Sequence, residues 1–145
     1  MRSLQKIIIH CSATPEGRDV QTKEIKQWHL DRGWSDIGYH FVIQLDGSIH
    51  DGRPVELSGA HAKGHNADSI GICYVGGVDE DGEPKDTRGT EQVSSLLDLV
   101  LDLRASYGKQ MSVHGHNEFS EKACPCFDVQ EEFQNIGDIE KERNI

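Results

Sequence analysis

The sequence predicts a single α/β domain over residues 1–145, with a central mixed β-sheet of about five to six strands flanked by helices. Short β-branched runs such as Ile7–Ile9 indicate buried strands, and a long amphipathic pattern beginning at Thr90 indicates a helix. Strand and helix patterns interleave along the chain, which is typical of helices packed on one sheet. A length of 145 residues without repeats or a linker fits one domain.

The first strand is predicted at "QKIIIH", residues 5–10. The small and polar residues of "CSATPEG" favour a loop after it, so His10 is expected at the carboxyl end of a strand. In "TKEIKQWHLDRGW", the spacing of Ile25 and Trp28 predicts a helix with one apolar face. We expect Thr22 to cap this helix and Gly33 to end it.

A hairpin and a central strand are predicted next. In "YHFVIQLDGSIHDGR", alternation from Tyr39 to Leu45 leads to a turn at Asp46-Gly47 and resumes at residues 48–50, so Tyr39 is expected to begin a strand. "DSIGICYVGGV" predicts a further strand over residues 70–75, and its glycines indicate a turn or a close approach of backbone.

The segment "TEQVSSLLDLVLDLRASY" predicts a helix that Thr90 caps, with Glu91 in its first turn. Its expected buried stripe consists of Val93, Leu96, Leu97, Val100, Leu101 and Tyr107. "QMSVHGHN" predicts a short strand that ends near His114 or His116, and the polar tail has weak helical character.

Composition excludes several classes of function. The formal net charge of -10, from 25 acids against 15 bases, argues against binding to nucleic acid, which requires clustered lysine and arginine. The apolar run at the amino terminus is too short for a signal peptide or a membrane span, so we expect a protein made in the cytoplasm, without membrane insertion.

Four cysteines occur at positions 11, 73, 124 and 126, and without a secretion signal we expect them to be reduced thiols or metal ligands. Cys124 and Cys126 form a C-x-C pair, which differs from the C-x-x-C of thioredoxin-like sites. A redox enzyme is therefore disfavoured.

A metal site is predicted if the strand of His10 and the late strand before His116 lie side by side, with Cys124 in a following loop. Three such ligands leave a fourth position open, as in catalytic zinc sites. Two alternatives follow from spacing: His114 and Cys126 are neighbouring ligand candidates. The structural alternative is that His10 is a histidine packed in the core and Cys124 a small buried thiol.

Four blocks carry a family resemblance: "IIIHCSAT", "IKQWHLDRGWSDIGYHFVIQLDGSI", "HAKGHNADSIGICYVGG" and "HNEFSEKACPCFD". In order, from about residue 6 to 128, they resemble the small phage lysozymes that are N-acetylmuramoyl-L-alanine amidases, relatives of the peptidoglycan recognition proteins. The resemblance implies Zn2+ held by His10, His116 and Cys124. His116 keeps the family's distance to Cys124, and Cys124 follows the "KA" pair and precedes proline, as the family's ligand does.

The resemblance also implies an activity and the residues that support it. Tyr39 and Lys122 are expected to complete the catalytic site, and His61, in a glycine-flanked loop, is expected to contact substrate. His29 and His40 are interpreted as packing residues. The implied reaction is zinc-dependent hydrolysis of the amide between N-acetylmuramic acid and L-alanine in bacterial peptidoglycan.

The expected partner is thus the bacterial cell wall, reached by a monomeric phage or prophage endolysin that stays cytoplasmic until its release. One alternative is a peptidoglycan-binding module without catalysis, but binding-only relatives typically lack the cysteine ligand, and Cys124 is present. Another is a regulator of RNA polymerase, as some phage relatives are. Few residues precede the first strand and no basic patch exists, which counts against polymerase binding.

Overall fold

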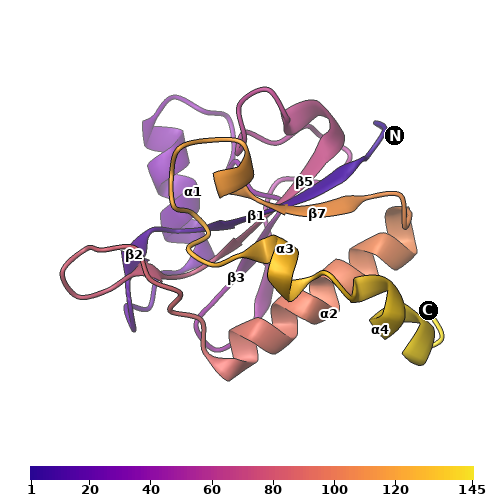
Figure 1. The fold of residues 1–145 in the computed structure, drawn as a ribbon. Helices are drawn as coiled ribbons and strands as arrows, with labels where there is room; N and C mark the ends of the chain where they lie inside the picture. Colours follow the sequence, from indigo (N-terminus) through magenta and orange to yellow (C-terminus); the bar gives the residue numbers. More distant parts are fainter.

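The computed structural model describes residues 1–145, which form one mixed sheet with helices on both faces (Figure 1). The five-stranded sheet has the order β4-β3-β5-β1-β7. Only the β3–β4 pair is antiparallel. The strand bounds are β1 Lys6–Cys11, β3 Phe41–Ile43, β4 Ile49–Asp51, β5 Ser69–Tyr74 and β7 Ser112–Gly115. The expected mixed α/β sheet is confirmed.

Four α-helices and a second, very small sheet complete the fold. The helices are α1 Thr22–Asp31, α2 Thr90–Tyr107, α3 Val129–Glu132 and α4 Ile136–Glu142. Single 3₁₀ turns lie at Asn66–Asp68 and His116–Glu118. The strands β2 (Thr14–Pro15) and β6 (Gly77–Val78) pair separately from the main sheet. No helix is both long and apolar enough to cross a membrane.

The two faces of the sheet pack against hydrophobic cores of different size. Side chains alternate along β1, so Ile7 and Ile9 join the large core that α2 and α3 cover. A smaller core on the other face packs Ile25 of α1 against Val42 of β3. His10 alternates with Ile9 and therefore belongs to the α1 face. The alternation of one strand thus selects the face on which a site can form.

The helix caps lie one residue earlier than expected. Gln21, not Thr22, is the N-cap of α1, and its backbone N–H donates to the Glu24 carboxylate at 3.0 Å. Gly89, not Thr90, is the N-cap of α2, and its N–H donates to Oε1 of Gln92. In both helices a side chain of the first turn reaches back to the cap, so the cap residue needs no hydroxyl.

The structure also corrects the predicted start of the hairpin strand and the predicted buried residues of α2. The strand of the hairpin begins at Phe41, so Tyr39 lies two residues before it and does not begin it. Val93 and Tyr107 are exposed, while Leu99, Leu103 and the side chain of Gln92 are buried. The Gln92 amide donates to the Val75 carbonyl oxygen at 3.0 Å, which is why a polar residue occupies a core position.

The polar tail folds back over α2. Val129 and Phe133 enter the large core, and Glu140 of α4 pairs with Arg104 of α2 at 3.0 Å. The weak helical character expected for this tail corresponds to the short helices α3 and α4.

Candidate functional site

Sheet topology brings His10 and His116 together. His10 is the penultimate residue of β1, and β1 pairs in parallel with β7. His116 directly follows β7, so both residues lie at the same edge of the sheet. Their ring centroids are 4.5 Å apart. The condition on which the sequence predicted a metal site, that these two strands lie side by side, is met.

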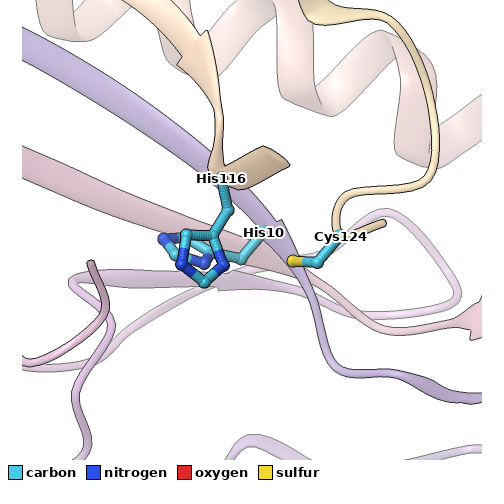
Figure 2. A group of neighbouring side chains, drawn as sticks. All are labelled: His10, His116 and Cys124. Carbon is cyan, nitrogen blue, oxygen red and sulfur yellow. The ribbon is translucent and has the colours of Figure 1, made fainter. Parts of the chain in front are cut away.

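Cys124 reaches the same edge from the loop that follows β7. The backbone N–H of Cys11 donates to its Sγ at 3.1 Å, and the buried Tyr74 hydroxyl anchors the next residue by donating to the Pro125 carbonyl oxygen at 2.6 Å. Figure 2 shows the His10, His116 and Cys124 side chains pointing toward one another. One potential ligand atom from each lies within 4.8 Å of the other two.

The surroundings of His10 and His116 disfavour the protonated form of each ring. Burial lowers the pKa of His10 well below its usual value, and the neighbouring His61, His116 and Lys122 lower it further. Burial and then the charge of Lys122 lower the pKa of His116. Because a metal binds the unprotonated imidazole, this environment favours the form that acts as a ligand.

The donor set fits zinc. Two imidazoles and one thiol are ligands that zinc prefers, and tetrahedral zinc with bonds of about 2.0–2.3 Å holds its ligand atoms roughly 3.3–3.8 Å apart. The three side chains meet this spacing with small movements, since their ligand atoms are already within 4.8 Å. Three protein ligands leave one position open, which is the arrangement of a catalytic site.

The neighbouring ligand candidates lie elsewhere. His114 is on β7, where its ring nitrogens contact Ser112 at 2.6 Å and Glu118 at 2.8 Å. Cys126 packs against the large core with its Sγ 4.0 Å from Sγ of Cys11, and burial raises the pKa of its thiol to about 12. Neither belongs to the cluster of potential ligands.

Tyr39 and Lys122 flank the cluster. The ring of Tyr39 is half-buried, with its centroid 5.2 Å from that of His10. Burial and then the nearby thiols raise the pKa of the Tyr39 phenol well above its usual range, so its O–H remains a hydrogen-bond donor at neutral pH. Lys122 is exposed and lines the same groove.

The cluster lies in a groove of about 700 Å³, within the usual size range of small-molecule sites. Trp28, Arg32 and Trp34 line one part of it and Lys63 another, together with His61. No Asp or Glu is among its lining residues, although the whole chain has a net charge of -10. The groove is therefore a cationic region on an acidic protein.

The two histidines that were expected to be packing residues differ in their surroundings. His40 is a packing residue as expected: it is buried, with Nδ1 accepting from the Gly71 N–H and Nε2 contacting the Leu57 carbonyl oxygen. His29 is also buried, but it lines the groove beside Trp34. The helical spacing of Trp28 and His29 placed both on the inward side of α1, and that spacing is the same whether a helix faces a core or a cavity.

Comparisons with known proteins identify the family of this chain. Residues 1–127 match the family model described as N-acetylmuramoyl-L-alanine amidase. The endolysin of Escherichia phage T7 is 43% identical over 128 residues, which cover 88% of this chain and 84% of the endolysin.

Solved structures show the same architecture. LysC, an N-acetylmuramoyl-L-alanine amidase from Clostridium intestinale URNW, superposes with a TM-score of 0.77 at 29% identity, over 99% of this chain and 87% of LysC. Drosophila PGRP-LB superposes with a TM-score of 0.74 at 26% identity, over 92% of this chain and 81% of that protein. In sequence and in fold, the chain belongs to the N-acetylmuramoyl-L-alanine amidase family, the enzymes that separate peptidoglycan stem peptides from the glycan.

Proposed function

We propose that this chain is a zinc-dependent endolysin that hydrolyses the amide between N-acetylmuramic acid and L-alanine. In this proposal His10, His116 and Cys124 hold the zinc ion. The observation that carries it is their convergence from β1, from the turn after β7 and from the following loop, where all three line one groove. Residues 10 and 124 are far apart in the sequence, so chance proximity of three zinc-type ligands is a poor explanation.

Each neighbouring side chain has a chemical task in this scheme. Zinc in such a site supplies a Lewis acid that activates water for attack on an amide. The ammonium of Lys122 stabilises the negative charge that develops on the carbonyl oxygen. The Tyr39 hydroxyl, which burial keeps protonated, donates a hydrogen bond to the reacting group. No carboxylate lines the groove, so neither Asp nor Glu is in place as a general base.

The groove also suits a peptide attached to a sugar. Arg32 and Lys63 offer positive charge to the carboxylates of a stem peptide, and Trp28 and Trp34 offer apolar surface to a sugar ring. His61 keeps its proposed place as a substrate contact. Since both of its ring nitrogens have partners, a substrate would meet its ring carbons. Action on the cell wall would follow release of the protein from the cytoplasm.

The presence of all three potential ligands supports hydrolysis over simple binding. A binding module needs the groove but not Cys124, which lines it beside the two histidines. Besides its contact with the large core, the Cys124 thiol accepts a hydrogen bond from the Cys11 N–H, which orients Sγ without a partner that competes for a metal.

The test measures zinc and activity on the same samples. We expect about one zinc per chain in protein purified without added metal, and release of free L-alanine amino termini from purified cell walls. His116→Ala should lose both. His114→Ala is the matched control, because it removes a histidine two residues away that lies outside the cluster. Wild-type protein without zinc, or His116→Ala with its zinc intact, would contradict the proposal.

A further inference from the structure

We propose that His61 and Ser69 are positioning residues that hold His10 in the tautomer with its proton on Nε2, so that the bare Nδ1 atom faces the metal. This inference rests on the proposed function, in which His10 is a zinc ligand. It concerns which atom of His10 binds the metal and which residues make that choice. A chain of three hydrogen bonds carries it.

The first of these hydrogen bonds ends at the carbonyl oxygen of His65, an atom that can only accept. The Ser69 hydroxyl lies 2.7 Å from the carbonyl oxygen of His65, which can only accept, so the single Ser69 proton points there. Ser69 Oγ is also 3.2 Å from Nε2 of His61. With its proton committed, Oγ can only accept from that nitrogen. His61 Nε2 therefore carries a proton.

The proton positions then follow along the chain. A neutral imidazole protonated at Nε2 has a bare Nδ1 atom. Nδ1 of His61 lies 2.8 Å from Nε2 of His10, so His10 Nε2 must be the donor of this hydrogen bond. A doubly protonated His61 would place a cation beside the imidazoles of His10 and His40 in a groove without carboxylates. Nδ1 of His10 is left as the free lone pair.

Contacts of both its backbone and its ring fix the position of His61. Its backbone N–H donates to Oδ1 of Asn66 at 2.9 Å. Its ring lies against β5 at Gly71, where a Cβ would be 2.6 Å from Cγ of His61. A Cβ at Gly59 would also lie 2.8 Å from the ring. The absence of a side chain at Gly71 and at Gly59 therefore leaves room for the imidazole of His61.

Such a partner matters because a ligating histidine usually donates its second N–H to an acceptor that fixes ring orientation and tautomer. The usual acceptors are carboxylates, carbonyls or water. Here the acceptor is a neutral imidazole, which orients His10 without adding negative charge next to the metal. Loss of partners of this kind typically costs about 10–100-fold in metal affinity.

The first test measures zinc affinity by competition with a chromophoric chelator. We expect His61→Phe, which keeps an aromatic ring but removes the acceptor, to bind zinc about 10–100-fold more weakly. His61→Asn should stay near wild type, because its Oδ1 can replace Nδ1 as acceptor. His65→Phe is the matched control: it changes a histidine in the same loop but keeps the carbonyl oxygen that Ser69 contacts. Equal affinities for wild type and His61→Phe, or no rescue by Asn, would overturn the inference.

The second test needs no variant. Ring ¹⁵N NMR of wild-type protein should show His10 protonated at Nε2 both without and with zinc, and zinc bound at Nδ1. A proton on Nδ1, or zinc on Nε2, would overturn the inference. The two proposals fail separately: a wild type that binds no zinc contradicts the proposed function, whereas zinc affinity indifferent to His61 contradicts only the role of the hydrogen-bond chain.

Discussion

Lys122 and Tyr39 line the same groove as the three proposed metal ligands and are not among them. If they stabilise the transition state, Lys122→Ala and Tyr39→Phe should lower kcat while zinc content and KM change little. Loss of one oxyanion donor typically costs about 10²–10³ in rate, and Lys122→Ala should lose at least that because a full charge is removed. Steady-state hydrolysis of a muramoyl peptide, with zinc measured on the same samples, tests whether kcat falls at constant zinc content. An unchanged kcat in Lys122→Ala would identify Lys122 as an ordinary surface lysine.

The two cysteines of the C-x-C pair differ in what surrounds them. Both cysteines contact the large core, but only the Sγ atom of Cys124 lies near the ring nitrogens of His10 and His116, whereas Sγ of Cys126 lies 4.0 Å from Sγ of Cys11. We expect Cys124→Ser to lose zinc and activity, and Cys126→Ser to remain near wild type in both, because a serine oxygen is a poor substitute for a zinc thiolate. Zinc analysis and the cell-wall assay measure this. Equal losses in the two variants would mean that the ligand is Cys126 or is shared.

At the scale of elements, the ion pair of Arg104 and Glu140 joins α4 to α2. The hydrogen bond from Arg104 holds the pKa of the Glu140 carboxyl below its usual 4.5. A carboxyl with a lowered folded-state pKa stabilises the fold above its unfolded pKa, and this contribution is lost as pH falls through the folded value. Glu140→Gln should therefore lower the free energy of unfolding by about 1.5–3 kcal/mol at neutral pH.

Urea unfolding at neutral pH and at a pH well below 4.5 measures this difference. The gap between wild type and Glu140→Gln should shrink at the lower pH, where wild-type Glu140 is also uncharged. Asp98→Asn is the control, since the Arg143–Asp98 pair is exposed and should contribute less than about 1 kcal/mol. A gap that is equal at both values of pH would show that Glu140 acts through packing alone.

Elements with a strong local pattern were predictable from the sequence, and contacts between elements were less so. The run Ile7–Ile9 and the helix from Thr90 have clear periodicities. The approach of His10 and His116 was predicted only on the condition that their strands lie side by side, because no local pattern fixes the pairing of β1 with β7. The caps at Gln21 and Gly89 were missed because the capping groups come from the following turn. The contact of His61 with His10 depends on a loop whose path no periodicity encodes.

At the scale of the whole molecule, the proposed zinc site joins β1, the turn after β7 and the following loop. A ligand that binds only the folded state stabilises it, by about 2.7 kcal/mol at a concentration 100 times its Kd. Removal of metal with a chelator should therefore lower the Tm by several degrees, and zinc should restore it. Calorimetry with and without chelator is the measurement. The Cys124→Ser variant should show a smaller difference, and an unchanged wild-type Tm would argue against a tightly bound metal.

The position of β1 inside the sheet has a consequence for the order of events in folding. β1 begins at Lys6 but pairs with β5 and with β7, which starts at Ser112. Contacts between such distant segments form slowly, because a long loop must close before they give any stability. During synthesis, β1 has no partner strand until β5 and then β7 have been made, and Cys124 follows both. The three proposed metal ligands are therefore among the last residues that can come together, and a chain interrupted before β7 would have neither a finished sheet nor the proposed site.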